Sequence, residues 1–457
     1  MISLKRPYGN TLFPWNELRA NLDLLLDPSF PHREELLQFI WEQRLFDVEG
    51  LCTVDGEPIE VLEPGLRQSG SGPDLVGARL RIGGQLWAGS VEVHVRAGEW
   101  YAHGHHLDAA YDSVVLHVVW AHDMDIRTAS GNCPPTVVLR ERVAPERLVL
   151  FERLLRSRGW VPCAGGLAGV EREVVDRCLE DMLEERLERK AASIAAAYAQ
   201  LGHDPAATAY HALLRGFGGP VNADACAMLA HALPLRVLLK VRDDAVRTEA
   251  LLFGQAGLLE GEFRDDHPRV LQREHHLLAR LHGLAPMPGA AWRYGRLRPS
   301  AFPSLRLAQF ARFIARHGDA LVDLVLRAAP ETLREAFAVE AGSYWNDRSR
   351  FDSPAIHASK RLGDEAIDHL LINAVLPLRL FLGRAFGHPR PLEEARAFLR
   401  TLPAEDNAVV RGWRKAGITV RDAAGSQALL ELRGNHCGQR RCLTCVIGME
   451  LLSEPFR

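Results

Sequence analysis

The sequence predicts an α/β domain with a mixed central sheet, followed by a mostly α-helical domain and a small cysteine-rich C-terminal segment. Three observations support this prediction. Alternating apolar and polar residues surround a Gly-Gly turn, apolar residues take helical spacing after about residue 145, and three cysteines lie close together near the end of the chain. We expect an N-terminal arm at 1–32, the α/β domain at 33–145, the helical domain at 146–405 and the C-terminal segment at 406–457.

The α/β domain is expected to begin with a helix from Arg33 to Leu45, where apolar residues recur at helical spacing. Two strands follow, Asp74 to Ile82 and Gln85 to Arg96, and Gly83-Gly84 between them is typical of a two-residue hairpin. A short helical piece and a further strand come next, and this order predicts a mixed sheet with helical cover. These last two elements span His105 to Tyr111 and Ser113 to Trp120.

Helical spacing dominates the remainder of the chain. Pro145 to Arg158 and Glu171 to Leu201 are each expected to form one helix, and further helices are expected within 205–285 and 305–400. The second domain is therefore expected to be mostly α-helical. Two short apolar segments near the end are candidate strands, Gly417 to Val420 and Ala428 to Leu432.

Composition narrows the class of protein. With 457 residues, 47% of them hydrophobic and 25% charged, the chain is expected to be globular with more than one core. A formal net charge of −3 excludes a generally basic nucleic-acid binder, although a local basic face stays open. The first residues lack the apolar stretch of a secretory signal, and no apolar run approaches the roughly 20 residues of a membrane span. We therefore expect a cytoplasmic protein that does not bind membranes.

A cluster of acidic residues and histidines between Asp74 and His117 is the strongest candidate site. In Glu92-Val93-His94 the two polar side chains share one face of a strand, and Asp74 opens the preceding strand. Two carboxylates and an imidazole near one sheet edge could hold a divalent cation that activates water. The alternative is a solvated polar face with ordinary surface histidines. Further candidates within the cluster are His103, His105, His106, Asp108 and Asp112, with His117 at its end.

The register of the hairpin decides whether these carboxylates can meet. A strict two-residue turn places Asp74 opposite Val93, so that Asp74 would point away from Glu92 and His94. A shared site therefore requires a bulge of one residue or a longer turn, and Gly89-Ser90 is the expected place for a bulge.

The order of these elements resembles the PD-(D/E)XK nuclease superfamily. In that superfamily Pro-Asp begins the second core strand and Glu-x-Lys lies on the third, as Pro73-Asp74 and Glu92-Val93-His94 do here. The resemblance implies that Asp74 and Glu92 bind Mg2+ or Mn2+. His94 stands where the superfamily has its lysine, and a histidine there can ligate the metal or act as a base.

The same resemblance implies a metal-dependent phosphodiesterase or nuclease that acts on nucleic acid. Two other functions stay open. One is a catalytically inactive nuclease-fold protein that binds nucleic acid or a protein partner, which the histidine in the lysine position favours. The other is a metalloenzyme of another class, built on the histidines between His94 and His122. Two further roles are assigned on the same basis: Glu35 or Glu42 as an accessory acid on the first helix, and Arg96 as the missing positive charge.

Over nearly its whole length the chain is also similar to a bacterial family catalogued as domain of unknown function 2851. That resemblance implies membership of the family and no particular activity. The matching stretches are Ser71-Gly72-Pro73-Asp74, Leu86-Trp87-Ala88-Gly89, Val91-Glu92-Val93-His94, Leu252-Phe253-Gly254-Gln255-Ala256-Gly257, Arg298-Pro299, Phe302-Pro303 and Arg306-Leu307-Ala308-Gln309-Phe310.

Three cysteines near the C-terminus, Cys437, Cys442 and Cys445, have the spacing C-x4-C-x2-C. Thiols this close can converge on a zinc ion or an iron–sulfur cluster, which needs a fourth ligand. Cys163 is the best distant candidate, and His436 is a poorer one because it adjoins the first cysteine. The alternative is three free thiols in a turn. A bound metal would be structural, because a full set of protein ligands leaves no open position.

A segment that interleaves arginine with aromatic residues, Trp292 to Pro299, is a candidate nucleic-acid surface. Guanidinium groups suit phosphate, and aromatic faces stack on unpaired bases. The alternative is that these arginines pair with acidic residues on an ordinary surface. The arginines assigned to this surface are Arg293, Arg296, Arg298 and Arg306.

Overall fold

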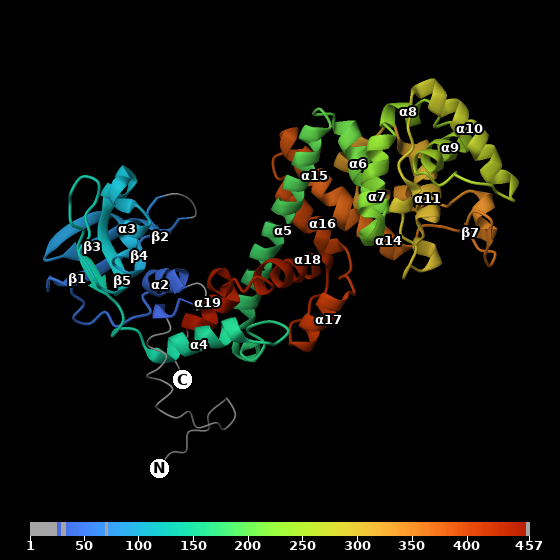
Figure 1. The fold of residues 1–457 in the computed structure, drawn as a ribbon. Coiled ribbons are helices and arrows are strands. Elements are labelled where there is room, and N and C mark those ends of the chain that lie inside the picture. The colour runs from blue at the N-terminus through green and yellow to red at the C-terminus, as the bar shows by residue number, and fades with distance from the viewer. Residues whose placement is uncertain (1–24, 29–32, 69–71, 454–457) are drawn as a thin grey trace, which may run out of the picture. The chain divides into compact units, whose positions relative to one another are not determined.

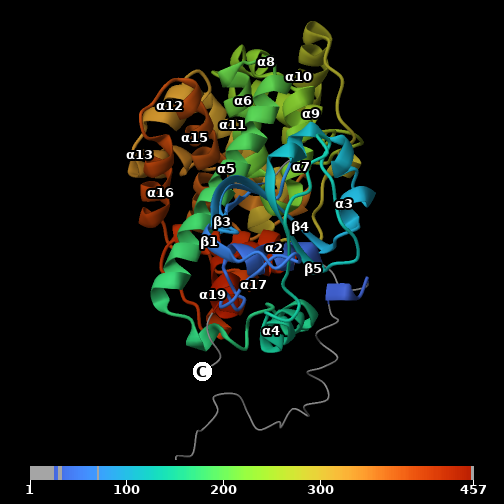
Figure 2. The ribbon, with the colours of Figure 1, turned by 90° about the vertical axis from the view of Figure 1, so that its left-hand side faces the viewer.

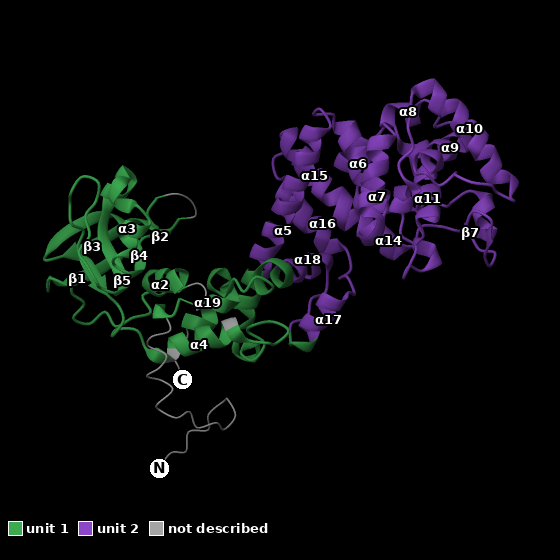
Figure 3. Cartoon of the chain, in the orientation of Figure 1, with its two compact units in different colours: residues 1–178, 415–417, 432–457 green, residues 179–414, 418–431 purple. Residues whose placement is uncertain are grey.

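The computed structural model describes residues 25–28, 33–68 and 72–453, so the expected arm at 1–32 lies almost entirely outside the described residues. The chain forms two compact units (Figure 3). The first contains residues 1–178, 415–417 and 432–457, and the second contains 179–414 and 418–431. The structure thus divides the chain differently from the sequence: the end of the chain, with its cysteines, belongs to the unit that the N-terminal part begins.

The first unit contains the mixed sheet that the sequence predicts (Figure 1). The strand order is β1-β3-β4-β5-β6, with β2 also paired to β3. Strands β1, β3 and β4 are antiparallel neighbours, whereas β4, β5 and β6 run parallel. The strands are β1 (Ile59–Glu63), β2 (Leu66–Arg67), β3 (Leu75–Ile82), β4 (Gln85–Arg96), β5 (Val114–Ala121) and β6 (Thr136–Val138).

Helix α2 (Arg33–Glu42) contacts β4, the central strand of this sheet. Its apolar face is fully inside: Leu37 and Trp41, four residues apart, both have no exposed surface. The helix ends at Glu42 rather than at Leu45. The polar residues of α2 that flank its buried apolar face are therefore held close to the sheet.

The hairpin between β3 and β4 contains the bulge that a shared site requires, on the opposite strand from the one predicted. Gly83 and Gly84 form the turn with φ values of 57° and 87°. Ala78 pairs with Gly89, but Leu75 pairs with Val91, so β3 carries one extra residue between these pairs. Because of this extra residue, Asp74, which directly precedes β3, lies beside Glu92.

Gly77, inside this bulge, has a φ of 71°, which side chains with a Cβ rarely adopt. We predict that Gly77→Val destabilises the protein by about 1–3 kcal/mol and that Gly77→Asn costs less, since asparagine tolerates this conformation. A Cβ at this position meets nothing within 4 Å, so the cost comes from the backbone alone. Urea denaturation measures both variants, and a Gly77→Val protein as stable as the wild type would contradict the assignment of the bulge.

The remainder of the chain is mostly helical, as predicted. Helix α4 (Pro145–Arg156) lies in the first unit, and α5 (Arg172–Gln200) begins there and continues into the second. The helices of the second unit can be followed in Figures 1 and 2: α6 (Pro205–Phe217), α7 (Gly219–Ala232), α8 (Leu235–Leu239), α9 (Ala245–Gln255), α10 (Asp266–His282), α11 (Pro303–His317), α12 (Leu321–Arg327), α13 (Pro330–Phe337), α14 (Asp364–Leu370), α15 (Leu376–Ala385), α16 (Pro391–Thr401), α17 (Ala408–Lys415) and α18 (Ala423–Glu431).

The two candidate strands near the end of the chain are wrong. Ala428 to Leu432 lies in α18 and the π-helix that follows it, and 417–420 forms no strand. Alanine, leucine and glutamate are strong helix formers, and an apolar run this short does not distinguish a strand from a buried helix. The last helix, α19 (Val446–Ser453), belongs to the first unit.

A buried ion-pair network joins α5 to α18 within the second unit. The Glu431 side chain has no exposed surface and accepts hydrogen bonds from Arg186 at 3.1 Å and from Arg189 at 2.6 and 3.0 Å. Lys190 donates to Asn373 at 2.8 Å and to a neighbouring glutamine of α18 at 2.7 Å. The cationic groups on this face of α5 thus find hydrogen-bond acceptors inside the unit.

One helical stretch among the described residues, Asp364 to Ala385, is long and apolar enough to cross a membrane by length and composition alone. It joins α14 and α15 through the π-helical turn Leu371–Val375. This stretch departs from the expectation that no apolar run approaches the length of a membrane span. Of its most apolar window 67% is buried inside the structure, which is the burial of a core helix.

Candidate metal centre

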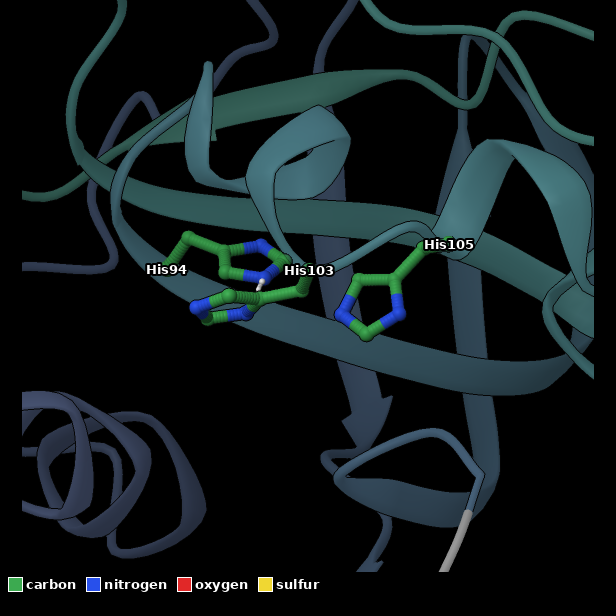
Figure 4. A group of neighbouring side chains, drawn as sticks. All are labelled: His94, His103 and His105. Carbon is green, nitrogen blue, oxygen red and sulfur yellow. Dashed lines mark hydrogen bonds between the residues drawn. The ribbon is translucent and has the colours of Figure 1, made fainter.

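The acid-and-histidine cluster lies on the central strand β4 and on the loop that follows it. Glu92 and His94, two residues apart on β4, are 3% and 0% exposed. The chain then turns back through α3 (Glu99–Ala102), and Gly104, with a φ of 78°, lets the loop reverse between His103 and His105. Figure 4 shows the three imidazoles, one from the strand and two from the loop, side by side.

The loop is anchored by its own buried aromatic residues. Trp100 has no exposed surface, and its indole N–H donates to the carbonyl of Arg127 at 2.9 Å. The His105 ring stacks on Tyr111 with 3.8 Å between ring centres. These contacts hold the loop histidines over β4.

The three imidazoles are close enough to share one metal ion. The candidate ligand atoms of His94, His103 and His105 all lie within 4.8 Å of one another. His94 Nε2 is 3.2 Å from His103 Nδ1, and His94 Nδ1 is 2.9 Å from Nε2 of His117, which comes from β5. With Nε2 of His94 facing a metal, its Nδ1–H donates to His117, which would fix the orientation of the ring.

Carboxyl groups surround the imidazoles. Glu92 Oε1 lies 3.1 Å from His105 Nε2 and 3.8 Å from His94 Nε2, and Glu34 Oε1 on α2 lies 3.9 Å from His94 Nε2. The backbone N–H of Asp74 donates to Glu92 Oε2 at 3.0 Å, and Asp74 Oδ2 accepts from the N–H of Val93 at 3.0 Å. The bulge in β3 is what brings Asp74 beside Glu92.

Burial leaves this cluster without charge compensation. Desolvation, followed by repulsion from Asp74, raises the pKa of Glu92 to about 9, and the same causes raise the pKa of Glu34 to about 7. Desolvation and neighbouring imidazoles lower the pKa of His94 to about 2 and that of His105 to about 4. His94 and His105 are therefore neutral at pH 7, with lone pairs free for a metal, and a divalent cation would supply the positive charge that the carboxyl groups lack.

A polar cavity of about 290 Å³ lies beside the cluster. Its lining includes His103, which is exposed, and Glu34, so a ligand in the cavity reaches the edge of the imidazole group. The other lining residues are Pro28, Arg33, Glu35, Val95 and Glu99.

The structure brings together Asp74, Glu92, His94, His105 and His117, with His103 completing the group. The other residues assigned to the site do not join this group, although Glu35 lines the neighbouring cavity. Arg96 is exposed at the end of β4, Glu35 is exposed, and Glu42 forms an ion pair with Arg67 at 2.8 Å. Asp108 is exposed and accepts a hydrogen bond from the N–H of Ala110 at 2.9 Å.

Glu34 is the functional candidate that the sequence analysis missed. It precedes Gln38 by one helical turn, and a hydrogen bond from the Gln38 side chain lowers the pKa of Asp74 against the larger effect of burial. Glu34 also precedes the buried Trp41 by two turns. The sequence could have indicated Glu34, because residues one and two helical turns apart share one face of the helix.

In the second unit, the segment Trp292 to Pro299 has exposed arginines, but its aromatic rings are covered. Its aromatic residues do not offer free faces: Trp292 is 7% exposed and donates to the carbonyl of Ala256, and the guanidinium group of Arg350 lies 4.0 Å from the ring centre of Tyr294. These two rings therefore give no support to stacking on unpaired bases, and nucleic-acid binding by the arginines stays a prediction. Of the assigned arginines, Arg293, Arg296 and Arg298 are exposed, and Arg306 is half-buried beside Gln309.

Comparison with known proteins gives a family and no activity. No curated protein and no solved structure matches the chain. The model of the family described as Protein of unknown function (DUF2851) matches residues 34–408, and the chain therefore belongs to that family.

Proposed function

We propose that the protein is a metal-dependent phosphodiesterase that acts on nucleic acid, with the metal held by His94, His103, His105 and Glu92. The observation that carries this proposal is the convergence of three imidazoles with carboxyl groups of raised pKa beside a polar cavity. Strongly perturbed groups that face one cavity are typical of functional sites.

The donor set favours a transition metal. Imidazole nitrogen suits Mn2+, Fe2+ or Zn2+, whereas Mg2+ prefers oxygen ligands and water. Of the two ions that the sequence suggests, Mn2+ is therefore preferred over Mg2+. A divalent cation at this position supplies charge stabilisation for a phosphate group and activation of water.

Residues of the chain itself would transfer the proton, bind the phosphate group and position the metal ligand. Glu34, whose pKa is raised to about 7, is matched to accept a proton near neutral pH. Arg33 lines the same cavity and can hydrogen-bond a phosphate oxygen. His117, hydrogen-bonded to His94, is a positioning residue.

The resemblance to PD-(D/E)XK nucleases supports phosphodiesters as the substrate class. The hairpin that carries Asp74 and Glu92, followed by short helices and the parallel strand β5, has the order that the resemblance implies. Histidine in the lysine position favours a second candidate, a nucleic-acid-binding protein without catalysis. The cavity contains more glutamates than arginines, so phosphate should bind there only with the cation present.

The test uses the purified full chain with Mn2+, Zn2+ or Mg2+ and labelled single- and double-stranded DNA and RNA. We expect cleavage that requires the metal and that falls at least about 100-fold in His103→Ala, because one ligand is lost. His103 is exposed, so this variant should fold.

The matched control is His122→Ala, which removes a nearby histidine that pairs with Asp125 at 3.3 Å, outside the group of three. It should keep wild-type activity. Metal-dependent binding of nucleic acid without cleavage would support the second candidate instead. A wild-type chain that binds no divalent metal at these histidines would contradict both candidate functions.

A further inference from the structure

Five cysteines of the first unit lie on three separate segments that meet at the end of the chain. Cys163 follows α4, and Cys178 lies near the start of α5. The others flank two short helical segments: Cys437 ends the π-helix Leu432–Cys437, Cys442 begins the 3₁₀ helix Cys442–Thr444, and Cys445 directly precedes α19. All five belong to the first unit, whose metal centre at the histidines uses none of them.

Contacts outside the cysteines place the loop that contains Cys163 against the C-terminal segment. The guanidinium group of Arg433 lies 5.4 Å from the ring centre of Trp160. Arg440 donates to the carbonyl of Ser157 at 2.9 Å. The two segments thus meet just before the cysteine-containing turn and within it.

The C-terminal turn is tightly built. The N–H of Arg441 donates to the carbonyl of His436 at 2.9 Å, and the N–H of Cys445 donates to the carbonyl of Cys442 at 3.4 Å. A Cβ at Gly448 would lie 2.2 Å from the carbonyl oxygen of Cys442, so only glycine allows α19 to approach this closely. The turn is therefore fixed before any ligand binds.

Three of the four thiols are buried. Cys163, Cys442 and Cys445 are 8%, 7% and 6% exposed. The loop that contains Cys163 also approaches α19, because a Cβ at Gly166 would lie 3.0 Å from a methyl carbon of Leu451. The segments that contain the four cysteines therefore meet in the interior of the first unit.

The sulfur of Cys445 lies among hydrogen-bond donors. The Cys178 thiol and the backbone N–H groups of Gly448 and Ile447 donate to it. Such hydrogen bonds fix the orientation of a ligating side chain, as a metal site requires.

We propose that Cys163, Cys437, Cys442 and Cys445 bind a soft metal centre, either a zinc ion or an iron–sulfur cluster, that fastens the C-terminal segment to the loop after α4. Cys178 then acts as a hydrogen-bond donor to Cys445 and not as a ligand. Four protein ligands leave no open position, so this centre is structural and independent of the proposed phosphodiesterase site.

The experiment is metal analysis of the full chain purified without oxygen, with visible absorption to tell the two centres apart. We expect either about one zinc per chain and no visible band, or iron with acid-labile sulfide and a broad visible band. The His103→Ala variant, which disturbs only the histidine centre, should keep this metal.

Variants then identify the ligands. Cys437→Ser and Cys163→Ser should each lose most of the metal, whereas Cys178→Ala and the exposed Cys133→Ser should keep it. Because ligand variants can fail to fold, the folded wild-type chain decides the matter: its four thiols should react with a thiol reagent only after a chelator removes the metal. A folded wild-type chain that carries no thiol-bound metal and takes up neither Zn2+ nor Co2+ would overturn the proposal, as would full retention of metal in Cys437→Ser.

Discussion

Replacing Glu92 by glutamine is expected to weaken Mn2+ binding at the candidate metal centre by at least about 100-fold, without lowering the stability of the metal-free protein. Loss of a residue that only supports a ligand already weakens metal binding by about 10- to 100-fold, and Glu92 is a proposed ligand. In the metal-free protein its carboxyl group is protonated at pH 7, because burial and Asp74 raise its pKa to about 9. Glutamine is a close neutral substitute for that form.

The direction in which the stability of the metal-free protein changes with pH follows from the raised pKa of Glu92. A folded pKa raised from 4.5 to about 9 gives stability that is complete below pH 4.5 and is lost as the pH rises toward 9. Metal-free Glu92→Gln should lack this loss and should equal or exceed the wild type in urea denaturation at pH 8.

Calorimetry in buffers of different ionisation enthalpy measures the proton balance. Mn2+ binding at pH 7 should release about one proton from Glu92 in the wild type, which the variant should not release. Glu60→Gln, on an exposed residue of β1 that pairs with Arg81, is the control and should change neither quantity. Unchanged Mn2+ affinity in Glu92→Gln would remove Glu92 from the ligand set.

Replacing Glu431 by alanine is expected to destabilise the second unit by about 3–5 kcal/mol. The change removes the only carboxylate that the structure hydrogen-bonds to both Arg186 and Arg189 among the described residues. Arg186 is largely buried, so it would be left as an uncompensated buried charge. The measurement is the free energy of unfolding from urea denaturation.

Glu188→Ala is the matched control for this network. Glu188 on α5 also forms an ion pair, with Arg384 on α15, but both side chains are 42% exposed. An exposed ion pair contributes about 1 kcal/mol or less, so the control should cost little. Equal effects of the two substitutions would contradict a special role for burial.

Local patterns predicted the hairpin, the mixed sheet and the helical remainder, because alternation and helical spacing are properties of neighbouring residues. The side of the bulge was not predictable in that way, because each strand offers a glycine. Gly77 supplies the left-handed backbone of the bulge, whereas Gly89 is needed for a close approach: a Cβ there would lie 2.5 Å from the carbonyl oxygen of Ser113. That contact comes from the residue directly before β5, which the hairpin sequence does not contain.

The candidate site was predictable for strand residues and less so for the loop and helix. Glu92 and His94 share a strand face by alternation alone. His103 and His105 reach them only because Gly104 reverses the loop, and Glu34 does so only because α2 packs on β4. The partnership of Cys163 with the late cysteines likewise depends on a return of the chain that no local pattern encodes.

The return of residues 432–457 to the first unit has a consequence for biosynthesis. The nascent chain emerges from the ribosome N-terminus first, so the sheet is made long before α19, which contacts α4 and whose Leu452 carbonyl accepts a hydrogen bond from Arg147. Until α19 has been synthesised, the surface that α19 covers faces the cellular milieu and its chaperones. A premature stop codon just before α19 would therefore damage the part of the protein that is synthesised first.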